Sequence, residues 1–167
     1  VSGGHTELVY MPDEWQFTIL GTTQDDAIGE AGDKVGRVLN LPYPGGVYVD
    51  RLAKEGKACY PLATPKTERE LDFSFSGIKS SVLQFIARCE RRNETFEPAD
   101  LACSYQECAL RELFTPTRIA LCQYQPKMMV LAGGVAANSR LREMVEQDLC
   151  NEFPDIRFVV PPLSCCT

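Results

Sequence analysis

The stretch that decides the fold class is KMMVLAGGVAAN, residues 127–138. Residues 127–132 form a mostly apolar run short enough for a buried strand, and Gly133-Gly134 ends it. A helix is expected from about Ala137 to Cys150, and a closing strand from Ile156 to Val160. Strand, helix and strand in this order predict a parallel pair of strands joined by a right-handed crossover.

Upstream of this unit, the pattern predicts a hairpin and then a block of helices. Strands are expected over 7–11 and 16–22, separated by a Pro-Asp turn. A loop rich in Pro, Thr and charge is expected over 60–69, and the expected helices span 25–39, 44–55, 76–91 and 98–123, the last with Pro116 as a candidate kink. Helices combined with short buried strands indicate an α/β layered domain.

Composition excludes several classes of protein. With 44% hydrophobic and 24% charged residues, the chain is neither a disordered tail nor a collagen-like repeat. No window approaches ~20 consecutive apolar residues, so no membrane span is expected. The net charge of −6 argues against wrapping nucleic acid over the whole surface, although a local basic patch or a partner subunit could still hold RNA. The chain begins at Val1 and closes on Cys-Cys-Thr, which suggests one partial domain over 1–167, cut at both ends.

Cysteine usage points to a reducing compartment. The eight cysteines include no C-x-x-C pair and stay below the roughly 8–10% typical of a disulfide scaffold. With one histidine in the chain, a zinc site is not expected. Most of the cysteines lie on apolar faces of the expected helices and are interpreted as small core residues. We therefore expect a cytoplasmic protein.

Two glycine-rich turns are candidate ligand loops. In residues 2–6, SGGHT, the backbone can approach a ligand and turn its N–H groups toward an anion, although Gly-Gly is also a common hairpin turn. Residues 133–138, GGVAAN, follow a strand, where nucleotide-binding α/β folds receive their ligands, but they do not match the dinucleotide fingerprint G-x-G-x-x-G. Asn138 could bind a sugar or a base, or merely cap the helix.

Three carboxylates stack at helical spacing. Asp26, Glu30 and Asp33 stand at i, i+4 and i+7, which places them along one face of the expected helix. Like charges in this arrangement repel, so one of them could serve a hydroxyl or a metal-bound partner. The alternative is a solvated acidic face near a helix N-terminus, where acids suit the dipole.

Residues 71–79, LDFSFSGIK, are unusual directly ahead of a helix. Phe73 and Phe75 alternate with serines, and Ser76 is a natural N-cap. Lys79 stands in the first turn, at the unfavourable end of the dipole, which suggests contact with phosphate or RNA. The favoured alternative is a strand end that packs two phenylalanines into the core.

These four motifs, together with YPGG at 43–46, closely resemble in order and spacing the TsaD family, the tRNA adenosine threonylcarbamoyltransferases. The resemblance covers essentially the whole chain, and the glycine turn is similar to that of the bacterial branch. It is carried by VSGGHT (1–6), DDA with its downstream acids (25–34), YPGG (43–46), DFSFSG (72–77) and AGGVAAN (132–138).

The resemblance implies a fold, a reaction and partners. The fold is that of actin, the heat-shock ATPases and the sugar kinases (ASKHA), of which this chain would be most of the C-terminal lobe. The reaction is acyl transfer: the threonylcarbamoyl group moves from threonylcarbamoyl-adenylate to N6 of adenosine 37 in tRNAs that read codons beginning with A. Bacterial members work with a catalytically silent paralogue, TsaB, and an ATPase, TsaE.

The resemblance also implies site residues. The backbone of Val1, Ser2, Gly3 and Gly4 would cradle the phosphate or carbamoyl part of the adenylate. Asp33 would bind ribose hydroxyls, Gly46 would permit close approach, Asp50 would add a polar contact, and Asn138 would complete the adenosine side. No catalytic residue is assigned.

Family members bind a metal, usually described as iron, and its ligands would lie outside this chain. They are a His-x-x-x-His pair upstream and an Asp that follows a Cys-Thr pair, whereas this chain has only His5 and stops at Thr167. The isolated chain is therefore expected to be inactive.

Rival interpretations are a non-catalytic paralogue or scaffold subunit of the same complex, a metalloprotease, and a sugar kinase of the same fold. The intact GGVAAN segment argues against the paralogue, and the lack of H-E-x-x-H argues against the protease.

Overall fold

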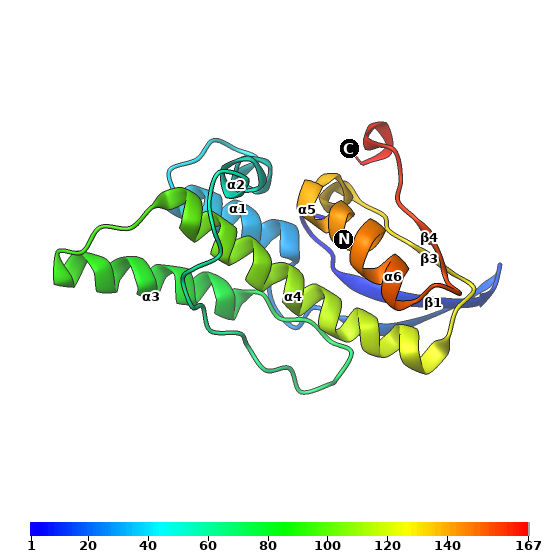
Figure 1. The fold of residues 1–167 in the computed structure, drawn as a ribbon. Coiled ribbons are helices and arrows are strands. Elements are labelled where there is room, and N and C mark those ends of the chain that lie inside the picture. The colour runs from blue at the N-terminus through cyan, green and yellow to red at the C-terminus, as the bar shows by residue number, and fades with distance from the viewer. Residues whose placement is uncertain (167) are drawn as a thin grey trace.

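A computed structural model describes residues 1–166 as a mixed α/β fold (Figure 1). Long helices occupy the middle of the chain, and short strands lie near both ends. In chain order the elements are β1 (Glu7–Asp13), β2 (Gln16–Thr22), α1 (Ile28–Val38), α2 (Gly45–Ala53), α3 (Ser76–Arg92), α4 (Pro98–Tyr124), β3 (Met128–Val130), η1 (Gly134–Ala137), α5 (Ser139–Glu143), η2 (Met144–Leu149), α6 (Cys150–Glu152), β4 (Arg157–Val159) and η3 (Leu163–Cys165).

Both predicted strand pairs are confirmed. β1 runs antiparallel to β2, with Val9 opposite Ile19, and β3 runs parallel to β4, with Met129 opposite Phe158. α5, the π-helical turn η2 and α6 follow one another without interruption between β3 and β4, as the predicted strand–helix–strand unit requires. Residues 60–69 contain no helix or strand, as expected.

The core lies where α4 meets the other helices. α4 is one helix through Pro116 and buries residues along most of its length, including Leu101, Tyr105 and Phe114. Phe73 and Phe75 are 1% and 0% exposed, which confirms that both pack into the core, although Phe73 forms only an isolated bridge with Thr23 and not a strand end. Burying such side chains contributes roughly 1.5–3 kcal/mol each.

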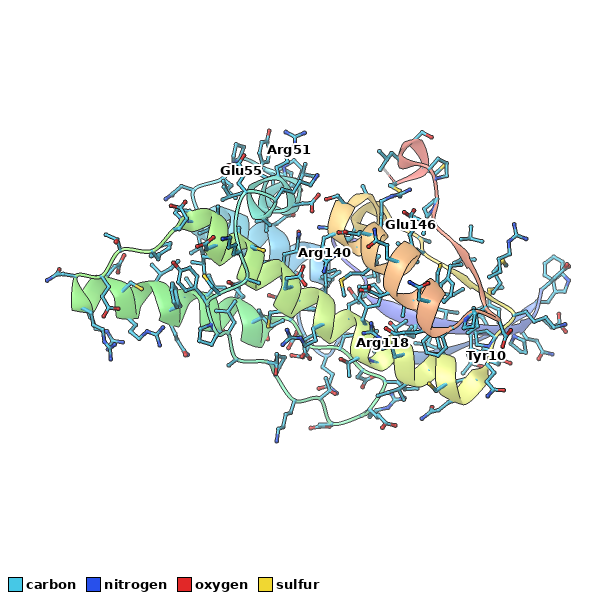
Figure 2. All side chains as sticks on the ribbon, in the orientation of Figure 1. Tyr10, Arg51, Glu55, Arg118, Arg140 and Glu146 are labelled. Carbon is cyan, nitrogen blue, oxygen red and sulfur yellow. The ribbon has the colours of Figure 1, made fainter. Side chains whose placement is uncertain are left out.

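Two arginine side chains connect separate elements in the second half of the fold. Arg118 of α4 forms a two-pronged ion pair with Glu152 of α6, at 2.7 and 2.8 Å, and Figure 2 shows it where the two helices pass. Arg142 of α5 donates to the carbonyls of Ala136 in η1 (3.1 Å) and Pro161 after β4 (2.8 Å). One guanidinium thus joins the turn that follows β3 to the segment that follows β4.

The prediction of a buried strand at β3 is wrong. Met128 and Val130 are 49% and 54% exposed, and only the residue between them packs inward. Among the described residues the strand has a single partner, β4, and its outward side chains stay about half exposed. Further large apolar side chains are exposed on and between β1 and β2: Val9, Met11, Trp15, Phe17 and Ile19.

Two helix starts, those of α1 and α5, and the cap expected at Ser76 differ from the predictions. α1 begins at Ile28 and not at Asp25, since the Asp25 side chain turns away to another helix. α3 starts at Ser76 as predicted, but its N-cap is Phe75, whose own side chain makes no capping hydrogen bond. Along 137–150, η1 forms first and α5 starts at Ser139.

All eight cysteines are free thiols, but only some are core residues. Cys89, Cys108 and Cys166 are buried as expected, whereas three are exposed: Cys59, Cys122 and Cys165. Desolvation and the carboxylate of Asp100 raise the pKa of the Cys59 thiol, and its sulfur lies 3.6 Å from that carboxylate. No helix within residues 1–166 is long and apolar enough to cross a membrane.

Candidate functional site

The glycine turn before β1 is closed by its own serine. The Ser2 N–H donates to the carbonyl of His5 at 2.8 Å, and the Ser2 hydroxyl oxygen accepts from the N–H of His5 at 3.0 Å. A Cβ at Gly3 or Gly4 would meet nothing within 4 Å, so one side of the turn is open. The stretch therefore forms a tight turn whose glycine backbone is accessible.

This turn lies against the GGVAAN segment, which is more than 130 residues away in the chain. The Val1 carbonyl accepts from the N–H of Val135 at 3.2 Å, and the Val1 nitrogen donates to Ala132 at 2.8 Å. Gly133 has φ +97°, and a Cβ there would stand 2.2 Å from the Val1 carbonyl oxygen. Gly133 is thus required both for its backbone conformation and for the close approach of Val1.

The same turn also meets the N-terminus of α1. The Gly29 N–H donates to the Ser2 carbonyl at 3.2 Å, and a Cβ at Gly29 would stand 2.6 Å from that oxygen. The fully buried Thr6 adds a side-chain contact, because its hydroxyl oxygen accepts from the N–H of Ile28 at 3.0 Å. An orphan N–H group of the first helical turn is satisfied in this way.

Glycines bring α1 and α2 unusually close, and Asp33 lies at their contact. A Cβ at Gly36 would stand 2.6 Å from the Cα of Gly45, and a Cβ at Gly45, the first glycine of the YPGG motif, would stand 2.9 Å from the Cα of Asp33, so close packing requires glycine at both positions. The Asp33 carboxylate accepts from the Gly46 N–H at 3.0 Å. A Cβ at Gly46 would meet only this carboxylate, at 3.9 Å, so packing within the chain does not demand glycine there.

Asp50 links α2 to α5. It is 9% exposed, and its two oxygens accept from the N–H of Ser139 (3.1 Å) and from the Ser139 hydroxyl (2.9 Å). The neighbouring Asn138 caps α5, because its Oδ1 accepts from the Leu141 N–H at 2.8 Å. Its Nδ2 donates to Oε1 of Gln106, in α4, at 3.0 Å.

These contacts form a closed ring that runs through the predicted site residues. The turn at 1–4 meets α1, α1 meets α2 at Asp33 and Gly46, α2 meets α5 at Asp50, and the segment before α5 returns to Val1. Each predicted residue thus lies on one connected ring of short contacts, although the stretches come from three distant parts of the sequence.

The acidic stack takes a different form from the predicted one. Asp26 lies before α1, so only Glu30 and Asp33 belong to the helix. Lys34 offsets the negative charge, with its ammonium 2.7 Å from both Asp26 and Glu30, and Lys79 of α3 lies 3.6 Å from Asp26. Lys79 therefore has a carboxylate partner within the chain.

The sequence reasoning missed Asp25, which caps α3 from outside. Its Oδ1 accepts from the N–H groups of Phe75 (2.8 Å) and Ser76 (3.1 Å), and its Oδ2 accepts from the hydroxyls of Ser74 and Ser76. Desolvation would raise the pKa of Asp25, but these hydrogen bonds outweigh it and hold the pKa below its ordinary value. The D-F-S-F-S spacing signalled a helix start, but the capping carboxylate is about 50 residues upstream.

Comparison with known proteins settles the family. A sequence model described as "TsaD: tRNA N6-adenosine threonylcarbamoyltransferase" matches residues 1–167. The chain belongs to the TsaD family. Curated relatives named tRNA N6-adenosine threonylcarbamoyltransferase include those of Geobacillus thermodenitrificans (49% identical, covering 100% of this chain and 49% of the relative) and of Streptococcus suis and Enterococcus faecalis (each 48% identical, covering 99% and 48%).

This TsaD chain spans about half the length of the curated relatives that it matches. The resemblance noted in the sequence is thereby confirmed over the whole chain. The mixed α/β structure is consistent with the family's fold.

The metal expected for a TsaD protein does not fit the described residues. Among residues 1–166, no group of three or more His, Cys, Asp or Glu side chains could hold an ion. The acids of the site are already engaged: Asp33 with Gly46, and Asp50 with Ser139. No chemical step is therefore assigned to a metal held by these residues.

A cavity of about 590 Å³ adjoins the ring on the side of α2, α4 and α5. Ser139 and Gln106 line it, so it begins directly beside the partners of Asp50 and Asn138. Lys54 and Arg140 bring positive charge to it, and Glu107 and Glu143 offset the charge of Arg140 at 2.6 and 2.8 Å.

Proposed function

We propose that this chain is part of an enzyme that transfers the threonylcarbamoyl group from threonylcarbamoyl-adenylate to N6 of adenosine 37 in tRNAs reading codons that begin with A. The observation that carries the proposal is the closed ring of contacts through Val1–Gly4, Asp33, Gly46, Asp50 and Asn138 in a chain of the TsaD family. Relatives that the chain matches over its whole length are named for this transfer.

In the proposed reaction a new N–C bond forms as the N6 amine attacks the carbamoyl carbonyl. The bond from that carbonyl to the phosphate oxygen breaks, AMP leaves, and N6 loses one proton. The chain's contribution is binding and orientation. The phosphate would lie against the open side of Gly3 and Gly4, where backbone N–H groups of a glycine turn can donate to it; the Gly4 N–H, which donates to the Ser2 hydroxyl at 3.3 Å, would then be shared with the phosphate. Asp33 would accept hydrogen bonds from the ribose hydroxyls, since a carboxylate offers several acceptor sites and Gly46 uses one.

We further propose that these residues form most of the C-terminal lobe of an ASKHA-type protein. The parallel β3–β4 pair, the hairpin β1–β2 and the Val1 segment bonded to the end of β3 support this proposal. Iron bound by residues outside 1–167, and assembly with a TsaB-like paralogue and a TsaE-like ATPase in the cytoplasm, belong to the same proposal. Nothing in the structure or the comparisons favours a non-catalytic scaffold.

The test uses the family-length protein, by which we mean a polypeptide that contains this chain and has the length of its relatives. Asp33→Ala and Asn138→Ala should each weaken AMP binding about 10-fold, the loss expected for one or two hydrogen bonds. Binding is measured by titration calorimetry and folding by thermal denaturation. Asp155→Ala is the matched control, because Asp155 is exposed and lies in a turn before β4.

Unchanged AMP affinity in both folded variants would show that the adenosine part binds elsewhere. A loss of affinity in Asp155→Ala as large as that in Asp33→Ala would point to a general effect of charge, because Asp155 is outside the ring.

A further inference from the structure

Gln106 is a buried amide on a helix face that is otherwise apolar. It is 8% exposed, and its neighbours Ala102, Tyr105 and Ala109 on α4 are buried. Burying an amide without a hydrogen-bond partner is unfavourable by about 1–3 kcal/mol, so such groups are almost always paired. The partner here is Asn138, whose Nδ2 donates to Oε1 of Gln106 at 3.0 Å.

The Asn138 amide is held at both ends by different elements. Its Oδ1 accepts from the Leu141 N–H in α5, and its Nδ2 donates to Gln106 in α4. An asparagine amide can rotate broadly about its last torsion, and two bonds to separate elements select one orientation. One N–H of Nδ2 and one lone pair of Oδ1 remain for a ligand.

We propose that Gln106 is a positioning residue, which holds the Asn138 amide in the orientation that binds the adenosine part of the adenylate. This inference rests on the proposed function. Gln106 itself does not need to touch the ligand, because its effect passes through the hydrogen bond to Asn138.

A purely structural role for Gln106 is less consistent with the surrounding contacts. The next residue, Glu107, forms a bidentate pair with Arg140 of α5, at 2.6 and 3.4 Å, and Figure 2 shows Arg140 between the two helices. Asp50 independently holds Ser139. α5 therefore stays docked without Gln106, and the cap on Leu141 is intact, while the Asn138 amide loses the bond that sets its rotation.

The experiment replaces the acceptor in the family-length protein and measures AMP binding by calorimetry. Gln106→Met keeps length and volume but removes the acceptor, and it should weaken AMP binding about 3- to 10-fold. Gln106→Glu keeps an acceptor oxygen in either protonation state and should stay within about 3-fold of wild type. Gln123→Met, an exposed position on the same helix, is the matched control. If thermal denaturation shows no folding transition for Gln106→Met, Gln106→Asn replaces it. The asparagine side chain is one methylene shorter, so its carbonyl oxygen does not reach the Asn138 amide.

A double-mutant cycle separates the positioning role from others. In the Asn138→Ala background, Gln106→Met should cause no further loss of AMP affinity, because the group through which it acts is gone. An equal loss in both backgrounds would overturn the inference, as would unchanged affinity for Gln106→Met while Asn138→Ala weakens binding. The last result leaves the proposed function standing. Unchanged AMP affinity in Asn138→Ala would also overturn the inference, since Asn138 is then not a ligand contact, whereas the proposed function is contradicted only if Asp33→Ala leaves the affinity unchanged as well.

Discussion

Removing the Asp25 carboxylate should loosen the first turn of α3. In Asp25→Ala the N–H groups of Phe75 and Ser76 lose their acceptor, and the hydroxyls of Ser74 and Ser76 lose a charged partner. The Phe75 side chain, which is 0% exposed, is part of the turn that loosens. The effect is therefore transmitted to the core from an exposed position.

The magnitude follows from the capping contacts. Substituting an N-cap side chain costs about 0.5–2 kcal/mol, and hydrogen bonds to a charged group contribute about 1.5–3 kcal/mol each when buried. Asp25 is exposed, so solvent screening reduces the sum of four such bonds, and the hydroxyls can turn to water. We expect a loss of about 2 kcal/mol at neutral pH, at the upper end of the capping range.

The pH dependence has a definite sign. Because the folded pKa of Asp25 lies below its ordinary value of 3.8, the stabilisation is present at neutral pH and is lost as the pH falls through the folded pKa. The difference between wild type and Asp25→Ala should therefore shrink in the acid range below the ordinary value.

Hydrogen exchange of the first turn of α3 in the family-length protein measures this difference locally. A loss of about 2 kcal/mol corresponds to roughly 30-fold faster exchange in the variant at neutral pH. Asp155→Ala should leave exchange in α3 unchanged. Equal exchange in wild type and Asp25→Ala, or a ratio that stays constant as the pH is lowered, would refute the capping role.

Three further predictions concern the backbone at Gly133, the hydrogen bonds of Arg142 and the reactivity of two cysteine thiols. Gly133→Ala should lower stability by about 2 kcal/mol or more, because of its positive φ and the overlap with Val1, and an unchanged thermal midpoint would contradict this. Arg142→Ala should cost about 1–3 kcal/mol, since two carbonyls lose a charged donor, and an unchanged thermal midpoint in this variant would show that the two-carbonyl bridge is not needed. Iodoacetamide should alkylate Cys122 faster than Cys59, whose raised pKa leaves less thiolate, as peptide mass spectrometry can measure.

Local pattern predicted most elements of the fold. The hairpin, the four helices and the parallel pair are where the periodicity and the turn residues put them, because these signals act over a few neighbouring residues. The burial of β3 was predicted wrongly for the same reason. An apolar run at 128–130 indicates a strand, but its exposure depends on which other segments cover it.

The sequence by itself determined the family and the positions of the glycine turns and polar residues of the site. It could not determine how those residues pair. Asp50 meets Ser139 across 89 positions, Asn138 meets Gln106 across 32, and Asp33 meets a backbone N–H on the next helix. Helix propensity and motif spacing describe neighbours along the chain, whereas these hydrogen bonds depend on how α2, α4 and α5 pack. The sequence already offered Asn138 as a cap, and the structure confirms it; only the tertiary structure shows that its amide is also held by Gln106, which no motif singled out.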